Sequence, residues 1–261
     1  MTIGTTTSPP STGGEGQPFQ PIQIHVRRLS KSFGPTQALV DVDAEFVGGT
    51  VHTVLGENGS GKSTLVKALS GVVVPDSGTI EIDGCIVSQF APRIMQLHGI
   101  ETVFQEVLTA PNRSIVENVY LGYHGLWRDR LSRAAQKRSS QEILELLGAP
   151  GLDVRLEVDA TPLFVQQLTV IARALVREPR ALILDEATAA LGLAERNALF
   201  EVIRELRDRG VLVVFVSHRM DEIMEISNSV TVLRNGAVID HVDRDHLEPS
   251  LLLRLMAPLG V

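Results

Sequence analysis

The sequence predicts an α/β fold in which helices cover both faces of a mostly parallel sheet. Short apolar runs rich in β-branched residues have the length of buried strands, and they lie at 50–55, 100–104, 181–184 and 211–216. Segments with helical periodicity lie between them, the clearest being 194–208, whose apolar residues share one face. Strands that alternate with helices in this way form parallel sheets with helical crossovers.

The remaining elements extend this order toward both ends of the chain. Residues 23–28 and 38–46 are predicted to be strands, the second with a clear alternation of apolar and polar residues. Turn glycines bound a further short strand at 78–84. Residues 230–242 are predicted to form a hairpin, because the Asn-Gly pair at their centre favours the tight turns of hairpins.

Three parts are expected along the chain. Residues 1–21 are rich in Thr, Ser, Pro and Gly and contain little to bury, which predicts a disordered tail. Residues 22–261 are expected to form one domain. From about 114 to 177 the pattern becomes helical and more highly charged, which predicts a helical subdomain inserted at about 106–178.

The composition argues against several classes of protein. A net charge of −7 at pH 7 argues against a nucleic-acid partner and against general affinity for anionic membranes. Cys85 is the only cysteine, so a disulfide framework is excluded and a reducing cytoplasm fits. No apolar run has the length of a membrane span, and the N-terminal residues do not have the pattern of a signal peptide. Another chain would have to supply any membrane part.

The most informative motif is a glycine-rich loop between the strand at 50–55 and a helical segment. It fits the phosphate-loop pattern G-x-x-x-x-G-K-[ST], and its strand–loop–helix context makes a chance glycine-rich turn the weaker interpretation. Glycines let backbone N–H groups approach phosphate oxygens closely. Lys62 would reach the β- and γ-phosphates, and the Ser63 hydroxyl would ligate Mg²⁺. The residues expected to bind nucleotide are Gly56, Glu57, Asn58, Gly59, Ser60, Gly61, Lys62, Ser63 and Thr64.

Two further patterns follow predicted strands. The apolar run 181–184 leads into Asp185 and Glu186, at the sheet edge where ligands bind in parallel α/β folds. An acid at a strand end is also common in ordinary loops, but the phosphate loop upstream favours a role for Asp185 in holding Mg²⁺ and for Glu186 in polarising the attacking water. His218 follows the strand at 211–216 and could contact the γ-phosphate, although a lone histidine is more often structural.

Taken in order, these motifs resemble the ATP-binding subunits of ABC transporters, and within that family the sugar-import branch. The resemblance covers about 23–256. Residues 29–34 resemble the segment whose aromatic residue stacks on adenine, here Phe33. Residues 102–106 resemble the glutamine loop, which implies that Gln105 contacts Mg²⁺ and senses the transport partner.

Three more segments, at 114–122, 185–191 and 217–223, also fit the sugar-import branch. The resemblance makes His218 the switch histidine of the family. It implies a P-loop NTPase fold of the ABC type, with a mostly parallel core sheet, an N-terminal antiparallel β subdomain and an inserted helical subdomain. It further implies that Glu186, His218 and Lys62 are catalytic and that Ser63, Gln105 and Asp185 hold Mg²⁺.

The chain departs from the family at the signature, Leu-Ser-Val-Gly-Gln in sugar importers. In the family, the signature serine and glycine bind the γ-phosphate that the opposite subunit holds. Counting back from the helix that ends at 171–175 places Thr161-Pro162-Leu163-Phe164-Val165 at this position. Pro162 offers neither a hydroxyl nor an N–H, and Phe164 puts a ring where close backbone approach needs glycine. No glycine lies between Leu152 and Arg180, so a shifted alignment does not restore the motif.

The resemblance implies an ATP-binding and ATP-hydrolysing subunit of an importer for sugars or similar small polar solutes, with ATP and Mg²⁺ bound. Such a subunit would lie in the cytoplasm, peripherally on the inner face of the cell membrane. Its partners would be transmembrane permease subunits and, indirectly, a periplasmic or lipid-anchored solute-binding protein. The altered signature adds the expectation that a second ATPase domain, as a tandem half or in a heterodimer, supplies an intact signature. Two alternatives stay open: a nucleotide-sensing domain with little hydrolysis, and an ABC ATPase outside transport.

Overall fold

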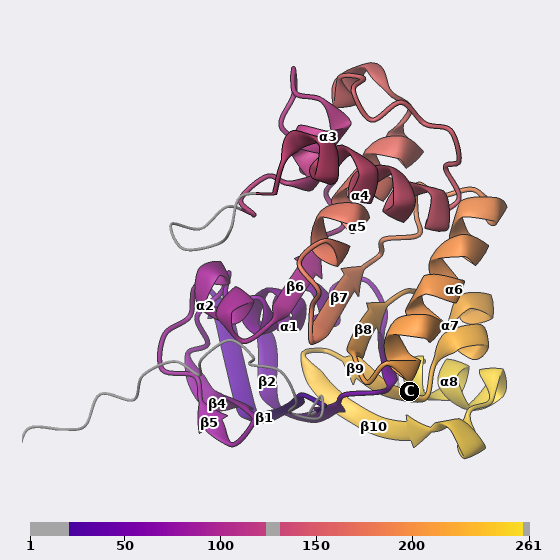
Figure 1. Cartoon of the computed structure of the whole chain (residues 1–261). Helices are drawn as coiled ribbons and strands as arrows, with labels where there is room; N and C mark the ends of the chain where they lie inside the picture. The colour runs from indigo at the N-terminus through magenta and orange to yellow at the C-terminus, as the bar shows by residue number, and fades with distance from the viewer. Residues whose placement is uncertain (1–20, 124–130, 258–261) are drawn as a thin grey trace, which may run out of the picture.

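The computed structural model describes residues 21–123 and 131–257, which form two β-sheets and the helices that pack on them (Figure 1). The central sheet has six strands in the order β10-β9-β3-β8-β7-β6. These strands are β3 (Val51–Leu55), β6 (Ile100–Val103), β7 (Ala181–Asp185), β8 (Leu212–Val216), β9 (Ser229–Arg234) and β10 (Ala237–Asp243).

The central sheet is parallel except at one edge. β3 pairs in parallel with both β8 and β9, and β7 pairs in parallel with both β6 and β8. β10 pairs antiparallel with β9. The predicted mostly parallel sheet is therefore confirmed, and so is the hairpin, which forms the antiparallel edge.

A second sheet is antiparallel and has the order β2-β1-β4-β5. Its strands are β1 (Gln23–Phe33), β2 (Thr36–Val47), β4 (Ser77–Ile82) and β5 (Cys85–Ile86). The predicted end of the first strand at Arg28 was wrong, because β1 continues to Phe33. Arg28 has a φ of +46°, and the register between β1 and β2 shifts around it, so the alternation breaks while the pairing continues.

The helices form three groups along the chain. α1 (Lys62–Leu69) and α2 (Pro92–Leu97) follow strands of the first half of the chain, and α6 (Leu193–Asp208), α7 (Met220–Ile226), the short 3₁₀ turn η2 (Arg244–His246) and α8 (Pro249–Met256) belong to the second half. Between these groups come α3 (Ile115–Val119), α4 (Arg133–Leu146), η1 (Val158–Ala160) and α5 (Leu163–Leu175).

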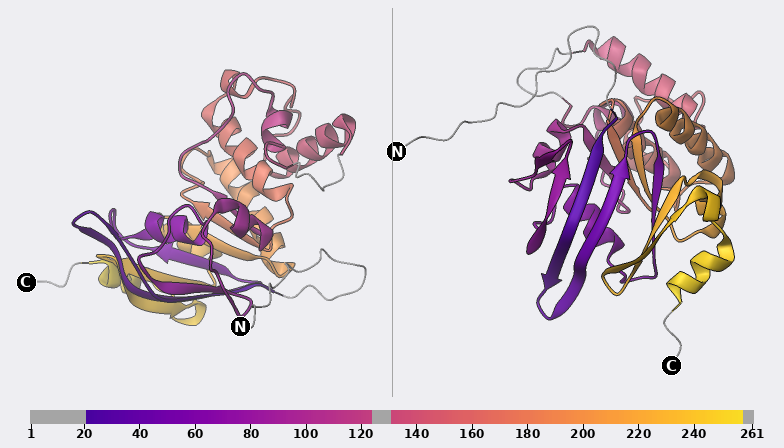
Figure 2. Two further views of the ribbon diagram at one scale, coloured as in Figure 1. Left: turned by 90° about the vertical axis from the view of Figure 1, so that its left-hand side faces the viewer. Right: turned by 90° about the horizontal axis from the view of Figure 1, so that it is seen from below.

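Helices α3, α4 and α5 gather at one end of the molecule, away from the antiparallel sheet (Figures 1 and 2). They fall within the segment that the sequence predicts to be helical, and the bounds of a subdomain at about 106 and 178 stay a prediction. Residues 1–20 of the predicted tail and residues 124–130 of the helical segment lie outside the described residues. Within the described ranges, no helix combines the length and the apolar character that crossing a bilayer needs.

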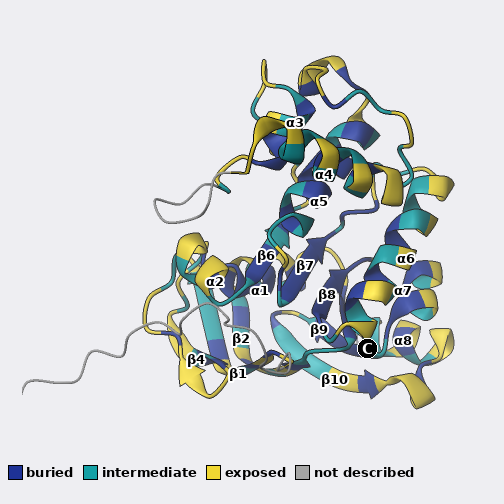
Figure 3. Cartoon of the chain, in the orientation of Figure 1, coloured by how far each residue is buried: buried dark blue, intermediate teal, exposed yellow. Residues whose placement is uncertain are grey.

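The middle strands of the central sheet are buried on both faces (Figure 3). Every residue of β3, β7 and β8 is buried. On one face, Val54, Ile183 and Val214 pack in a core shared with α1 and the antiparallel sheet. On the other face, Leu184 and Phe215 pack in a core shared with α3, α4, α5 and α6. Burial on both faces explains why these strands appear in the sequence as continuous apolar runs.

Candidate functional site

Four neighbouring strands deliver the predicted site residues to one edge of the central sheet. β3 leads into the phosphate loop at 56–64, β8 ends just before His218, β7 ends at Asp185, and β6 ends shortly before Gln105. These strands lie side by side in the order β3-β8-β7-β6 and run in the same direction. Their carboxyl ends therefore meet at one edge, which is where parallel α/β sheets bind ligands.

This edge is hollowed into a cleft of about 790 Å³. Most of the residues predicted from sequence line it: Gly56, Glu57, Asn58, Gly59, Gly61, Lys62, Ser63, Thr64, Gln105, Glu186 and His218. Three predicted residues are not part of the lining. Ser60 and Asp185 are buried, each 3% exposed, and Phe33 lies at the end of β1.

Four lining residues were not predicted. Thr36, Gln37 and Ala38 lie at the start of β2, and Met256 is the last residue of α8. Their residue types carry no sign of ligand binding. The packing of β2 against the phosphate loop brings Thr36, Gln37 and Ala38 to the cleft, and that contact joins segments that local sequence patterns do not connect.

Two glycines of the phosphate loop are fixed by close backbone contacts. A Cβ atom on Gly56 would lie 2.3 Å from the carbonyl oxygen of Leu233 in β9. Gly61 has a φ of +107°, and a Cβ atom there would lie 2.5 Å from the carbonyl oxygen of Ala38 in β2. Any side chain at either position would push the loop away from the two neighbouring strands. The glycines therefore set the loop conformation in which backbone N–H groups can face an anion.

Lys62 is held inside the loop. Its Nζ donates hydrogen bonds to the carbonyl oxygens of Gly56 (2.8 Å) and Glu57 (2.9 Å). Burial lowers the pKa of the Lys62 ammonium, and the nearby carboxylates of Glu186 and Asp185 oppose this effect. A phosphate in the loop would give the ammonium charged acceptors in place of neutral carbonyls, and charge-assisted hydrogen bonds are the stronger ones.

The carboxylate of Asp185, at the end of β7, lies in an environment that disfavours its charged form. Its side chain is buried, and its Oδ1 atom has no hydrogen-bond partner. Burial, reinforced by the charge of Glu186, raises the pKa of Asp185 from 3.8 to about 6, while Lys62 and Lys67 act in the opposite direction. A cation near Oδ1 would relieve this destabilisation of the carboxylate.

Glu186 lies at the centre of the polar groups that face the cleft. Gln105 Nε2 donates to Glu186 Oε2 at 3.2 Å, and His218 Nδ1 lies 3.4 Å from Glu186 Oε1. The backbone of Glu186 is left-handed, with a φ of +49°, which is uncommon for a residue with a side chain. The Glu186 N–H donates to the carbonyl oxygen of Val216 at 3.0 Å, which ties this turn to β8.

Phe33 is placed beside the cleft. Its ring is 49% exposed, and it pairs across the β1–β2 turn with Thr36, which lines the cleft. The Lys31 ammonium lies 5.5 Å from the centre of the ring. An exposed aromatic face at this position suits stacking on a base, and the role of Phe33 as the adenine platform stays a prediction.

The donor set at this edge fits Mg²⁺. Mg²⁺ prefers oxygen ligands and keeps several waters or substrate oxygens rather than a complete protein cage. Asp185 presents a buried oxygen with no partner, and Ser63 and Gln105 line the cleft with a hydroxyl and an amide. Among the described residues, no cluster of three or more His, Cys, Asp or Glu side chains forms an alternative metal site.

The segment that departs from the signature lies at the start of α5. The helix begins at Leu163, and Pro162 occupies the N-cap position without a side-chain cap. The Thr161 hydroxyl donates to the carbonyl oxygen of Val158 at 2.6 Å, and Phe164 packs against the core shared by α3–α6. Thr161 and Phe164 are thus used in local structure. That this segment cannot serve an opposing nucleotide stays a prediction.

Comparison with known proteins gives a consistent picture. The model of the family described as ABC transporter matches residues 39–189. The chain is 41% identical over 238 residues to a ribose import ATP-binding protein of Rubrobacter xylanophilus, and the match covers 89% of this chain and 45% of that protein. It is 39% identical over 233 residues to a protein of the same description from Escherichia coli O157:H7, which covers 89% of this chain and 46% of that protein. The chain thus spans about half the length of these curated relatives.

Solved structures share the fold. A dimeric bacterial ABC transporter cassette superposes with a TM-score of 0.78 at 22% identity, covering 85% of this chain and 98% of that one. A protein described as cbiO1 from Clostridium perfringens, part of the ABC transporter complex cbiONQ, superposes with a TM-score of 0.73 at 25% identity, covering 88% of this chain and 92% of that one. At this level of identity the likeness shows the ATP-binding cassette fold and nothing finer.

Proposed function

The chain belongs to the ABC transporter family, and on that premise we propose that it binds and hydrolyses ATP to drive the import of sugars or similar small polar solutes. One observation carries the proposal. The phosphate loop, the Asp185–Glu186 pair, Gln105 and His218 follow the ends of four adjacent strands at one edge, and all of these residues except Ser60 and Asp185 line the same cleft there. The sugar-import assignment rests on the relatives described as ribose import ATP-binding proteins.

ATP would lie with its phosphates in the loop at 56–64 and its adenine against Phe33. The loop N–H groups and Lys62 would offset the charge that develops on the γ-phosphoryl group, which is the main requirement of phosphoryl transfer. Glu186 would accept a hydrogen bond from the attacking water and align it with the γ-phosphorus. His218, 3.4 Å from Glu186, would steady the carboxylate and the γ-phosphate geometry.

Mg²⁺ would be held by Ser63, Gln105 and Asp185, and it would supply positive charge to the phosphate oxygens. The orphaned Oδ1 atom of Asp185 supports this part of the proposal. Gln105 also donates to Glu186, so the same side chain would link the metal side of the site to the carboxylate that orients water.

A second ATPase domain would complete the site. The start of α5 carries Pro162 and Phe164 where the resemblance places a serine and a glycine, so we propose that another domain supplies the intact signature to the ATP on this chain. That domain would be the other half of a tandem protein or the partner in a heterodimer. Permease subunits and, through them, a solute-binding protein outside the membrane complete the proposed assembly, with this chain on the cytoplasmic face.

Glu186→Gln tests the proposal in the assembled transporter, purified through a tag on this chain and placed in liposomes. The variant should lower MgATP hydrolysis about 10²–10⁴-fold, the range expected for losing a general base, and it should still bind ATP. Hydrolysis would be measured as phosphate release and transport as uptake of radiolabelled ribose. Glu225→Gln, an exposed acid on α7, is the matched control. Hydrolysis that is slow in the wild type and unchanged in Glu186→Gln would instead support a nucleotide sensor.

A further inference from the structure

A buried acid on α7 joins the two loops that carry Glu186 and His218. Glu222 lies within the first turn of α7, and its side chain is 0% exposed. A carboxylate taken out of water is tolerated when hydrogen bonds and an opposite charge replace its hydration. The groups that surround Glu222 therefore show what its carboxylate holds in place.

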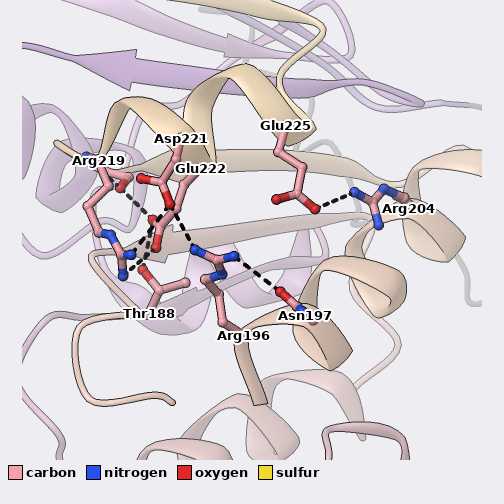
Figure 4. Close-up of polar contacts among 9 residues, drawn as sticks. Thr188, Arg196, Asn197, Arg204, Arg219, Asp221, Glu222 and Glu225 are labelled. Carbon is pink, nitrogen blue, oxygen red and sulfur yellow. Dashed lines mark hydrogen bonds and ion pairs between the residues drawn. The ribbon is translucent and has the colours of Figure 1, made fainter. Parts of the chain in front are cut away.

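Two hydroxyls donate to one oxygen of this carboxylate, and Figure 4 labels one of them, on Thr188. Thr188 Oγ1 lies 2.9 Å and Ser217 Oγ 2.7 Å from Glu222 Oε2. Thr188 follows Glu186 by two residues, and Ser217 directly precedes His218. Both hydroxyl-bearing residues are 3% exposed, so water is a poor substitute for the Glu222 oxygen.

The other oxygen of Glu222 faces the guanidinium of Arg219. Nη1 lies 3.1 Å from Oε1, in an ion pair rather than a well-directed hydrogen bond. α7 is in turn fastened to α6 by an ion pair of 2.8 Å between Arg196 and Asp221 (Figure 4). The carboxylate is therefore paired with the N-cap residue of its own helix, and that helix is anchored to α6.

Backbone pairing holds the two loops only at their roots. The ladder between β7 and β8 ends with Asp185 opposite Val216, and the hydrogen bond from the Glu186 N–H to Val216 follows it. Beyond that point, Glu222 bridges the loops through Thr188 and Ser217. We propose that Glu222 is a positioning residue for ATP hydrolysis and that it holds Glu186 and His218 at the distance that hydrolysis requires. This inference rests on the proposed function.

Glu222→Gln in the assembled transporter tests this role. The amide keeps the size of the side chain but loses the charge that faces Arg219, so the bridge weakens without leaving a cavity. We expect kcat to fall about 10- to 10²-fold, the cost of a small misplacement of reacting groups, while the Kd for MgATP stays within about twofold. Glu225 lies on the same helix as Glu222 and forms a 2.8 Å ion pair with Arg204 of α6. Glu225→Gln removes this ion pair and is expected to leave kcat and the Kd for MgATP unchanged.

A double-mutant cycle separates positioning from general damage. Because Glu222 acts partly through His218, the double variant His218→Ala/Glu222→Gln should lose less kcat than the product of the two single losses. Losses that multiply, or a Glu222→Gln enzyme with normal kcat, would overturn the proposal.

Hydrogen exchange gives a readout that does not need turnover. In the full chain, amides at 186–191 and 217–220 should exchange about fivefold faster in Glu222→Gln, while those of the phosphate loop should not change. Thr188→Val and Ser217→Ala should each loosen the loop that contains the substitution, and they carry the test if Glu222→Gln does not fold. Unchanged exchange in all of these variants overturns the positioning role. A wild-type assembly without ATPase activity overturns the proposed function and leaves the exchange result to decide the role of Glu222.

Discussion

The phosphate loop and the start of α5 are both helix beginnings, and they differ in every feature that binds phosphate. The loop before α1 has glycines in tight contact with β2 and β9, and a lysine aimed into its turn. The start of α5 has a proline at its N-cap and an aromatic ring packed into the core. One helix start is open and electropositive, and the other is filled by its own side chains. This difference supports the proposal that the chain binds nucleotide at its own phosphate loop and that a second ATPase domain supplies the signature that contacts this nucleotide.

The difference between the two helix starts is tested most strongly by supplying a restored signature at the start of α5 on a second chain. A donor chain with Pro162→Ser and Phe164→Gly would regain the hydroxyl and the glycine, and Lys62→Ala would disable its own phosphate loop. Mixed with the wild-type chain, the donor should raise MgATP hydrolysis about 10²-fold, because lost phosphate donors of this kind cost about 10²–10³ in rate. Phosphate release by each chain alone and by the mixture is the measurement.

The matched control for this mixture is a donor with Lys62→Ala and the natural α5 start. If that donor stimulates equally, the altered segment is irrelevant. Robust, cooperative hydrolysis by the wild-type chain alone would contradict the need for a second domain altogether.

The electrostatic strain on the nucleotide side predicts a pH dependence of stability. The pKa of Asp185 is raised to about 6, so between pH 4 and 6 the unfolded chain loses a proton that the folded chain keeps. In Mg²⁺-free buffer the free energy of unfolding of the wild type should therefore fall relative to that of Asp185→Asn as pH rises through this window. By pH 7 the penalty should reach about 3 kcal/mol relative to Asp185→Asn. Urea unfolding at pH 4 and pH 7 measures it, with the exposed Asp245→Asn as control. A constant difference between wild type and Asp185→Asn across this range would contradict the assignment.

The smallest expected effect concerns the binding of the adenine ring of ATP. Phe33→Ala should weaken ATP binding about tenfold, since stacking on an aromatic ring contributes about 1–3 kcal/mol per base. Inorganic triphosphate has no base, so its affinity should not change. Equilibrium dialysis with both ligands compares the two. Equal weakening of both would show that Phe33 supports the loop rather than the adenine.

Local patterns were sufficient for most elements of the fold but not for their neighbours. The apolar runs of β3, β7 and β8 are recognisable because both faces of each strand are buried. The insertion of β3 between β8 and β9 depends on pairing between segments far apart in the chain, which periodicity does not report. α2 and α8 were not predicted, because short helices contain too few turns to establish a period.

The site likewise contains residues that sequence motifs identify and residues that only the packing of the chain reveals. Lys62, Asp185 and Glu186 are recognisable because their chemistry needs fixed residue types at fixed spacings after a strand. Thr36, Gln37 and Ala38 reach the cleft only through the packing of β2 on the loop. In the sequence, Glu222 resembles any acid near the beginning of an amphipathic helix, and its role is visible only from its burial and its contacts with Thr188 and Ser217.

The strand order has a consequence for biosynthesis. Gly236 donates its N–H to the carbonyl oxygen of Ser60 at 3.0 Å, and Leu233 limits the space at Gly56, so the late β9–β10 hairpin supports a motif made early. A nascent chain that ends before β9 contains every residue of the phosphate-loop pattern and lacks the support that gives the loop its shape. We therefore expect a nascent chain of this length to bind nucleotide weakly. Tight nucleotide binding should appear only once the last strands of the sheet have been added.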